Sequence, residues 1–315
     1  MKILITGATG FLGKALALRL QQAGHQVTAL GRNQKIGSEL ITLGLTFECL
    51  DLKNKEALKQ IVSKQDIIFH AAALTKPTGH YQEFYESNTL ATRNLIEACL
   101  QSSIKRFVHI STPSIYMTHH SRFNILEEDP LPEKFINHYA HTKKLAEDEV
   151  DLGYSQGLPC VTLRPQAIFG PGDQTLFPRI LKLAKWGYYP KIGPEPVMLD
   201  LTYIDNIIDA ALLAMTSKRA LGFKINITNG EPYCLEQVFL LLNKKIKPFR
   251  LSYRVAYNLA KLFETFGREP SLSRYAVCAL GKSRTLNIDR AKALLGYQPR
   301  ISLEEGFRIF LRPFC

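Results

Sequence analysis

The chain has 315 residues, of which 46% are hydrophobic, so it can bury one or two sizeable cores. Its 40 Lys and Arg against 28 Asp and Glu give a formal net charge of +12, which suits an anionic cofactor, an anionic membrane surface or nucleic acid. No apolar run approaches the roughly 18–20 residues of a membrane span, which argues against a membrane-spanning protein. The sequence carries no signature of a nucleic-acid-binding fold, so we expect no nucleic acid partner.

The six cysteines are scattered along the chain and form no C-x-x-C pair. This pattern favours reduced thiols over a disulfide framework or a metal site, so we expect no metal. The first predicted strand begins at residue 3, which leaves no room for a signal peptide. Both observations predict a cytoplasmic protein.

The chain opens with a strand, a glycine turn and a helix. The apolar run Ile3–Ile5 predicts a short buried strand, and Phe11–Ala23 has the periodicity of an amphipathic helix. Between them Gly7, Gly10 and Gly13 are spaced as G-x-x-G-x-x-G. Such a turn lets backbone N–H groups and a helix N-terminus approach a diphosphate. The alternative is a glycine-rich turn that binds no ligand.

A second strand, Gln26–Leu30, leads into Gly31, Arg32 and Asn33. In a dinucleotide-binding sheet this point meets the adenosine ribose, where an acidic residue binds the 2′-hydroxyl of NAD and an arginine suits the 2′-phosphate of NADP. Arg32 stands here and no acid does, so the sequence favours NADP(H), with NAD(H) as the alternative cofactor. A solvated loop arginine without a ligand is the other interpretation.

Three more strands follow, over Leu45–Leu50, Asp66–His70 and Arg106–Ile110, with a long helix over Tyr81–Gln101. Strands that alternate with helices from the N-terminus predict an α/β protein with a Rossmann-type, doubly wound parallel sheet. The fourth strand runs into three alanines, Ala71 to Ala73. These small residues leave room for a cofactor across the strand ends, although tight strand-to-helix packing would also select alanine.

Thr112 follows the fifth strand, and a helix that opens at His138 carries Tyr139 and Lys143. Residues at i and i+4 share one face of a helix. A lysine ammonium near a tyrosine favours the phenolate and lowers the tyrosine pKa from its usual ~10, which makes it a usable general acid or base. The hydroxyl of Thr112 would orient the substrate oxygen. The alternative is an exposed helical pair without a catalytic role.

Together these motifs resemble the extended short-chain dehydrogenases/reductases, the NAD-dependent epimerase/dehydratase superfamily. The matching segments are Thr6–Gly13, Asp51-Leu52, His70–Ala73, Asn88 with Ala91-Thr92, Ile110–Tyr116, Tyr139–Lys143, Leu163–Pro165 and Tyr203–Ala210. The resemblance implies that Thr112, Tyr139 and Lys143 are the catalytic residues. With Arg32 added, the cofactor-binding residues that we expect are Gly7, Thr9, Gly10, Phe11, Leu12, Gly13, Asp51, Leu52, Ala71, Ala72, Ala73, Asn88, Tyr139, Lys143, Pro165 and Gln166.

Within the superfamily, the chain is similar to the 3β-hydroxysteroid dehydrogenase branch. The run Asp200–Ile204 resembles the Asp-Phe-Thr-Tyr-Val motif of that branch, and Arg284–Asn287 matches it too. Sugar-nucleotide enzymes commonly carry Arg-Asp where this chain has Leu199 and Asp200, and the arginine grips the sugar diphosphate. The dehydratases' Thr-Asp-Glu is Thr-Pro-Ser here, at residues 112–114. We therefore expect an apolar cleft, lined by Leu176, Phe177, Trp186, Tyr188 and Tyr189.

We expect two interleaved lobes around one cleft. Residues 1–165 and 200–228 form the NAD(P)-binding domain, and residues 166–199 and 229–315 form a smaller, mostly helical substrate-binding lobe. A helix is expected over Phe177–Trp186 and another over Ser252–Phe266. The second is amphipathic with basic residues around it, so it either packs on the lobe's core or lies on an anionic membrane.

The function that we predict is an NAD(P)-dependent oxidoreductase that interconverts a secondary alcohol and a ketone on an apolar, sterol-like or long-chain substrate. A nucleotide-sugar epimerase is the alternative. A cofactor-bound sensor without turnover is a third class, but it would not need an intact Thr-Tyr-Lys trio. We expect a homodimer with a small-molecule substrate.

Overall fold

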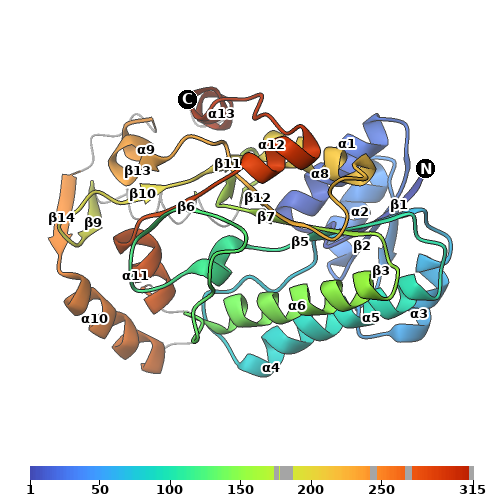
Figure 1. Ribbon diagram of the computed structural model, residues 1–315, viewed down its shortest axis with the longest axis horizontal. Helices are drawn as coiled ribbons and strands as arrows, with labels where there is room; N and C mark the ends of the chain where they lie inside the picture. Colours follow the sequence, from blue (N-terminus) through green and yellow to red (C-terminus); the bar gives the residue numbers. More distant parts are fainter. Residues whose placement is uncertain (174–176, 178–186, 242–246, 267–271, 312–315) are drawn as a thin grey trace.

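The computed structural model of the protein describes residues 1–173, 177, 187–241, 247–266 and 272–311. Its central element is a seven-stranded parallel sheet of order β12-β7-β5-β4-β1-β2-β3 (Figure 1). The chain thus winds outward in both directions from β1, which confirms the predicted Rossmann-type, doubly wound sheet. The strands are β1 (Lys2–Thr6), β2 (Gln26–Gly31), β3 (Thr46–Cys49), β4 (Ile67–His70), β5 (Arg106–Ile110), β7 (Cys160–Pro165) and β12 (Lys224–Ile227).

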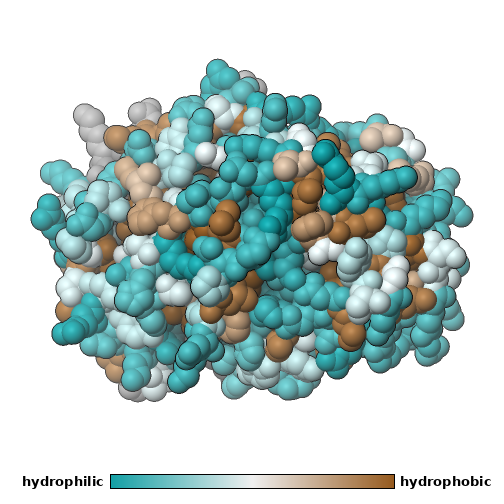
Figure 2. Space-filling view, viewed as in Figure 1, coloured by the Kyte–Doolittle hydropathy of each residue, from teal (hydrophilic) through white to brown (hydrophobic). Residues whose placement is uncertain are grey.

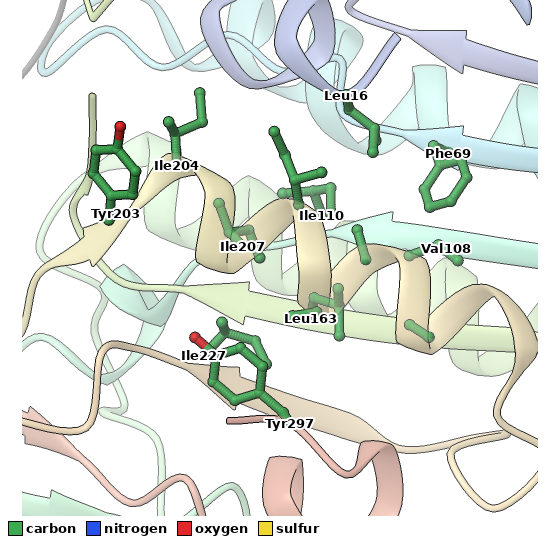
Figure 3. Packing of buried hydrophobic residues seen from close by; sticks show 14 of the residues in the cluster. Leu16, Phe69, Val108, Ile110, Leu163, Tyr203, Ile204, Ile207, Ile227 and Tyr297 are labelled. Carbon is green, nitrogen blue, oxygen red and sulfur yellow. The ribbon is translucent and has the colours of Figure 1, made fainter. Parts of the chain in front are cut away.

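Helices cover both faces of this sheet because successive strand residues point to opposite faces and both faces are apolar. Ile3 and Ile5 lie in the core beneath one helical layer, and Leu4 lies in the core beneath the other. The first layer is α1 (Phe11–Gln22), α2 (Gln34–Thr42) and α8 (Ile204–Thr216); the second is α3 (Lys55–Val62), α5 (Ala91–Leu100) and α6 (His138–Ser155). Figure 3 shows α8 lying over β5 and β7, with Ile207 near Ile110 and Leu163.

The first five strands begin and end within one residue of their predicted bounds. The long helix predicted over Tyr81–Gln101 consists of α4 (Tyr81–Phe84), a π-helical segment (Tyr85–Leu90) and α5. A π-helical turn inside a helix frequently marks a functional site. Strand β7 was not predicted, because Thr162 and Arg164 interrupt its apolar pattern although all six of its residues are buried.

The second lobe contains more strand than the sequence indicated. A four-stranded sheet has the order β13-β10-β15-β6, and two further strand pairs are β8 with β11 and β9 with β14. The elements are η2 (Pro113–Tyr116), β6 (Arg122–Ile125), β8 (Ile168–Phe169), β9 (Tyr188–Ile192), β10 (Met198–Leu199), β11 (Thr202–Tyr203), β13 (Tyr233–Cys234), α9 (Leu235–Leu241), β14 (Lys247–Leu251), α10 (Tyr253–Phe266), α11 (Arg274–Gly281), β15 (Arg284–Leu286), α12 (Asp289–Leu295) and α13 (Leu303–Leu311). The division into residues 1–165 with 200–228 and 166–199 with 229–315 stays a prediction, and the second sheet takes β6 from the first of these ranges.

The helix predicted over Phe177–Trp186 lies outside the described residues, apart from Phe177 itself. Within the described part of the chain, none of the helices is both long and apolar enough to cross a bilayer. On the face in Figure 2, apolar side chains form small separate groups among polar ones.

Candidate active site

The glycine turn between β1 and α1 has two glycines that the fold itself requires. Gly7 has a φ of +71°, and a Cβ there would lie 2.7 Å from the backbone of Ala72. A Cβ on Gly13 would lie 2.3 Å from the carbonyl oxygen of Gly7. A Cβ on Gly10, which is exposed, would meet only that oxygen, at 3.2 Å. Gly7 and Gly13 therefore pack the turn together, while Gly10 leaves its outer surface open.

The N-terminus of α1 fits an anion. Helix α1 begins at Phe11, followed by Leu12. Among the residues that the structure describes, no side chain caps this helix end and no acidic residue lies in its first turn. Uncapped N–H groups and the helix dipole favour negative charge. Thr9 packs over Gly31 at the end of β2, where a Cβ would lie 2.6 Å from the Thr9 Cγ2. The turn can thus hold the diphosphate of a dinucleotide that extends toward β2.

Arg32 lies directly after β2, as predicted, but it has an acidic neighbour that local sequence did not indicate. Its Nη1 lies 3.6 Å from Oδ2 of Asp51, at the end of the adjacent strand β3, and both side chains are exposed. An exposed pair of this kind contributes at most about 1 kcal/mol, so either side chain can exchange it for a ligand. Leu52 is buried, and the amide of Asn94 donates to its carbonyl at 3.0 Å. Asn94, which the sequence analysis missed, therefore fixes this loop.

The alanines after β4 are held in place by two buried polar groups. Asn88 accepts from the Leu74 N–H at 2.7 Å and donates to the Leu74 carbonyl at 3.3 Å and to Thr142 Oγ1 at 3.0 Å. Thr6 Oγ1 accepts from the Ala72 N–H at 3.3 Å. Asn88, expected as a cofactor contact, thus uses both amide N–H groups to join the 71–74 loop to α6.

The hydrogen bonds around His70 fix its tautomer. Thr92 donates its hydroxyl proton to the Asn88 carbonyl at 2.5 Å, so its oxygen must accept from His70 Nε2–H at 2.9 Å. His70 Nδ1 then accepts from the Thr6 hydroxyl at 2.7 Å. Burial lowers the His70 pKa to about 3, which agrees with a neutral ring.

Thr112 and Tyr139 meet at the carboxyl end of β5. The Thr112 side chain lies close enough to the Tyr139 hydroxyl to lower its pKa, against the effect of burial. Thr112 also accepts from the Ser114 N–H at 3.1 Å and donates to Ser114 Oγ at 3.1 Å. Ser114 in turn contacts the Tyr275 hydroxyl of α11 at 3.1 Å. The hydroxyl groups of Thr112, Ser114 and Tyr275 therefore form one chain beside Tyr139. The roles of Ser114 and Tyr275 were not predicted, because Tyr275 is distant in sequence.

Lys143 lies on the Tyr139 face of α6, but its ammonium group is directed toward β5. Its Nζ lies 2.9 Å from His109 Nε2 and donates to the Ile110 carbonyl at 2.8 Å. Burial lowers the Lys143 pKa to about 8, partly opposed by the charge of Glu147. These two bonds leave one N–H of the ammonium for a ligand.

The expected lowering of the Tyr139 pKa by Lys143 is not found. Burial raises the Tyr139 pKa, and the Thr112 side chain opposes that effect. Lys143 is not among the groups that shift the Tyr139 pKa. The physical reason is that the lysine spends its donors on His109 and Ile110. A tyrosine in this environment stays a neutral phenol at neutral pH.

His109 lies behind Lys143 and contacts its ammonium group. It is fully buried, stacks on His70 with ring centroids 5.6 Å apart, and meets Lys143 through Nε2. Its other nitrogen, Nδ1, has no hydrogen-bond partner among the described residues. Burial holds the His109 pKa well below its ordinary range, so the ring is neutral and accepts from the ammonium.

Pro165 and Gln166 lie at the carboxyl end of β7. The Gln166 N–H donates to the Ile227 carbonyl at 3.0 Å, and the Gln166 carbonyl accepts from the Thr202 hydroxyl at 2.5 Å. The predicted site residues therefore gather at the carboxyl ends of β1, β2, β3, β4, β5 and β7. This edge is where open α/β sheets bind their ligands.

Arg284 of β15 lies buried beside this site. The residue is more than nine tenths buried, its Nε has no hydrogen-bond partner, and its guanidinium forms no ion pair within the described part of the chain. Burial lowers its pKa, while Tyr275 and Asp200 lie close enough to oppose that shift. Asp200 itself accepts from the Leu286 N–H at 2.6 Å, and burial raises its pKa to about 6.

Of the five residues expected to line an apolar cleft, the structure describes Phe177, Tyr188 and Tyr189, and Phe177 does not line one. Phe177 is fully buried in an aromatic cluster with Phe169, Phe307 and Phe310, so it belongs to the core. Tyr189 is buried and Tyr188 is exposed. Leu176 and Trp186 lie outside the described residues. Leu199 pairs in β10 with β15 next to Arg284, where the sugar-nucleotide enzymes would carry an arginine.

The described residues contain no cluster of three or more His, Cys, Asp and Glu side chains that could hold a metal ion. The site instead combines a glycine turn that fits a dinucleotide, a chain of hydroxyl groups, a buried lysine, and a buried arginine with no ion pair among the described residues. A doubly wound sheet with this constellation at its carboxyl edge defines a dinucleotide-dependent enzyme of the short-chain dehydrogenase/reductase class.

Comparison with known proteins agrees with this class. The model of the NAD dependent epimerase/dehydratase family matches residues 3–228. A 2-alkyl-3-oxoalkanoate reductase of Stenotrophomonas maltophilia is 34% identical over 326 residues, which cover 98% of this chain and 98% of that protein. A 3-beta-hydroxysteroid dehydrogenase of Mycolicibacterium neoaurum is 30% identical over 97% of this chain and 89% of its own length.

The solved UDP-glucose 4-epimerase of Thermotoga maritima has a TM-score of 0.80 over 100% of this chain and 98% of its own, at 22% identity. A likeness at this identity shows the fold alone. From the family match and the relatives, the chain belongs to the NAD dependent epimerase/dehydratase family. It is an NAD-binding enzyme of the extended short-chain dehydrogenase/reductase type, with 3β-hydroxysteroid-dehydrogenase-like relatives.

Proposed function

We propose that the protein is an NAD(P)-dependent oxidoreductase that interconverts a ketone and a secondary alcohol on an apolar substrate that also carries a carboxylate. The observation that carries this proposal is the buried guanidinium of Arg284, which forms no ion pair with the described residues and lies near the hydroxyl chain of Thr112, Ser114 and Tyr275. Tyr275 lies within electrostatic range of both Arg284 and Tyr139. One end of this row of hydroxyl groups thus lies near the proton of the Tyr139 phenol, and the other lies near the positive charge of Arg284.

In the reductive direction, the phenol of Tyr139 donates its proton to the substrate oxygen, and burial favours the phenol form that this step needs. Thr112 would hold the same oxygen by turning its hydroxyl proton from Ser114 Oγ to the substrate. Lys143, whose ammonium donates to the Ile110 carbonyl and contacts His109, keeps one N–H for a bound ligand. The dinucleotide, when bound, supplies the hydride. Gly10, the α1 N-terminus and Lys143 are the groups that would hold it.

A carboxylate explains Arg284 better than a neutral substrate does. A buried guanidinium without an ion pair is costly, and a substrate carboxylate would satisfy it in a charge-assisted hydrogen bond. The 2-alkyl-3-oxoalkanoate reductase relatives are named for substrates that combine a ketone, a carboxylate and an alkyl chain. We extend that combination, a keto or hydroxy acid with a long apolar chain, to this protein. A sterol-like acid has the same chemistry.

The nucleotide-sugar epimerase is the rival function. Its support is the fold shared with the solved UDP-sugar epimerases and the family name. Against it stands Leu199, which offers no charge to a sugar diphosphate where the sugar enzymes place an arginine. Arg179 and Lys182, which could replace that arginine, lie outside the described residues.

The test compares matched substrates in a coupled assay of cofactor absorbance. We expect turnover of a 2-alkyl-3-oxo acid and much weaker turnover of its methyl ester and of UDP-glucose. Arg284→Gln should raise KM for the acid roughly 10- to 100-fold, because a hydrogen bond to a charged group is lost, and should leave the ester nearly unchanged. Equal effects of Arg284→Gln on acid and ester would reject the carboxylate. Micromolar UDP-glucose binding with epimerisation would favour the rival.

We also propose that NADP(H) is preferred, on the basis of Arg32 after β2. The exposed Arg32–Asp51 pair can open to let the guanidinium meet a 2′-phosphate. Arg32→Ala should weaken NADPH binding roughly tenfold and NADH binding little, since only NADPH carries the extra phosphate. Titration of both cofactors by fluorescence measures the ratio, and a wild-type preference for NADH would overturn this assignment.

A further inference from the structure

A strip of exposed apolar side chains runs along α10 and the neighbouring strand β14. Val255, Leu259, Leu262 and Phe263 of α10 each have between 38% and 51% of their surface exposed, and Phe249 of β14 has 58%. Val255, Leu259 and Leu262 follow the i, i+4, i+7 spacing of one helix face, and Phe263 adjoins that face. We call these five side chains the α10 strip.

The opposite side of α10 already packs against the protein. Ala256 and Ala260 are fully buried and form an apolar cluster with Ile192 of β9 and Val277 of α11. A surface helix normally turns one apolar stripe to the core and polar residues to water. Because α10 carries a second stripe that the core does not use, this exposed stripe marks an interaction surface.

Positive charge borders the α10 strip. Lys247 and Arg250 of β14 and Arg254 and Lys261 of α10 are exposed, and none of the four forms an ion pair within the described residues. The one acidic residue between positions 247 and 266 is Glu264, which is bonded to Arg274 at 2.6 Å. The surface is therefore apolar at its centre and cationic at its edge, which complements a bilayer with anionic headgroups.

We propose that α10 and β14 dock on an anionic lipid bilayer. The α10 strip enters the boundary between headgroups and acyl chains, and Lys247, Arg250, Arg254 and Lys261 lie at the level of the lipid phosphates. Each basic residue near such a surface contributes about 1 kcal/mol, equivalent to about fivefold in binding. A second copy of the chain fits less well, because it would bring the same four cations against this surface with no free acid to pair them.

The docking surface lies on the substrate side of the molecule. α11 packs against α10 (Figure 1). Tyr275 of α11 reaches Ser114 in the hydroxyl chain of the site. A bilayer at α10 would therefore lie one helix away from the catalytic end, where an apolar acid held in the membrane could enter. This link to the substrate rests on the proposed function, whereas bilayer docking itself does not.

The test is co-sedimentation of the full chain with vesicles of phosphatidylcholine alone or with phosphatidylglycerol added. We expect binding to the anionic vesicles at low salt and release at high salt, where charge attraction is screened. Arg254→Gln with Lys261→Gln should weaken binding roughly 25-fold. Leu262→Ser with Phe263→Ser should weaken it about tenfold or more, because apolar insertion is lost.

Matched pairs of control substitutions distinguish binding through this surface from non-specific electrostatic and hydrophobic binding to the vesicles. Lys218→Gln with Arg219→Gln removes the same charges from an exposed site elsewhere, and Ile41→Ser with Leu43→Ser removes equally exposed apolar residues. We expect both controls to bind like wild type, and all variants to keep their melting temperature and NADPH affinity. The proposal is overturned by absent binding at low salt, by equal losses in controls and α10 variants, or by α10 variants that change the oligomeric state and leave vesicle binding intact.

Discussion

Lys143 is a charged group placed where water cannot reach it. Only 1% of the residue is exposed, and its two hydrogen bonds go to a neutral histidine and a carbonyl rather than to a carboxylate. Glu147 opposes the shift but does not cancel it, and the Lys143 pKa falls to about 8. The ammonium is therefore unfavourable for folding, and a charge kept at such a cost is what we expect of a residue that serves a functional site.

This burial makes stability depend on pH in a direction that can be checked. The folded pKa of about 8 lies below the usual 10.5, so the folded chain releases this proton first. Stability from this group must rise as pH increases from about 8 to 10.5. Lys143→Met removes this titrating group, so the variant should be more stable than wild type at the lower end of that pH range. The difference in the free energy of unfolding should shrink by about 3 kcal/mol as the pH rises to 10.5. Urea unfolding at pH 7.5, 9 and 10.5 measures the difference, and a pH-independent difference would contradict a buried ammonium.

Tyr139→Phe tests the proton donor. The variant lacks one oxygen at a partly buried position and should fold and bind the cofactor like wild type. Turnover should fall roughly 10²- to 10⁴-fold, because the substrate oxygen loses its proton source. Steady-state rates with the best substrate give this ratio, and Tyr275→Phe, which removes the far hydroxyl of the chain, is the matched comparison. Turnover of Tyr139→Phe within threefold of wild type would remove Tyr139 from its role.

At the residue scale, the sequence predicted the candidate site residues that lie at a fixed local spacing from one another or from the end of a strand. Tyr139 and Lys143 are one helical turn apart, and Thr112 directly follows a strand, so their proximity was predictable. His109, Ser114 and Arg284 could not be assigned, because their importance depends on what surrounds them in three dimensions. An unpartnered nitrogen on His109 or Arg284 has no signal in the sequence.

At the scale of elements, the β1–α1 turn shows why one glycine motif contains two kinds of glycine. Gly7 and Gly13 approach neighbouring backbone too closely for any side chain, whereas a Cβ on Gly10 would make one tight contact, 3.2 Å from the Gly7 carbonyl oxygen, that a small shift relieves. Spacing alone predicted a diphosphate-binding turn, but it could not separate the two glycines that the fold requires from Gly10, whose outer surface stays open.

Two alanine substitutions should therefore have opposite effects. Gly13→Ala should destabilise the protein by several kcal/mol, since its Cβ would lie 2.3 Å from a carbonyl oxygen. Gly10→Ala should change the melting temperature by only a few degrees but weaken NADPH binding roughly tenfold or more, because its methyl group occupies the approach to the helix N-terminus. Thermal unfolding and cofactor titration of both variants decide this, and reversed effects would refute the distinction.

The elements themselves were largely readable from sequence in the first half of the chain and less so in the second. Apolar runs bounded by turn residues gave β1 to β5 with their ends. The two- and three-residue strands β10, β13 and β15 have no periodicity to detect, and they form only because the chain brings them together. β6 pairs with β15 across about 160 residues of sequence.

For the whole molecule, one buried polar network joins the two sheets. Arg164 of β7 donates to Glu147 of α6 at 2.9 and 2.5 Å, and also to the Tyr116 hydroxyl and the Glu127 carbonyl. Asn226 of β12 accepts from Tyr116 and donates to the carbonyl of Ile125, the last residue of β6. The network therefore links the central sheet, through β7 and β12, to the sheet that carries Arg284. Sequence could not show this, since five segments contribute to it.

Glu147→Gln should weaken this link. Glu147 is fully buried; burial alone would raise its pKa, but Arg164 and the hydrogen bonds from it lower the pKa, so the carboxylate is charged. A neutral amide would leave the Arg164 guanidinium buried without a counter-ion, which costs about 3–5 kcal/mol. Asp148→Asn, one residue along α6 and paired with Lys144 at the surface, should cost less than about 1 kcal/mol. Denaturant unfolding at pH 7 compares the two, with KM for the keto acid as a second readout. If Glu147→Gln costs no more than Asp148→Asn, the pair does not hold the sheets together, and the position of Arg284 must depend on other contacts.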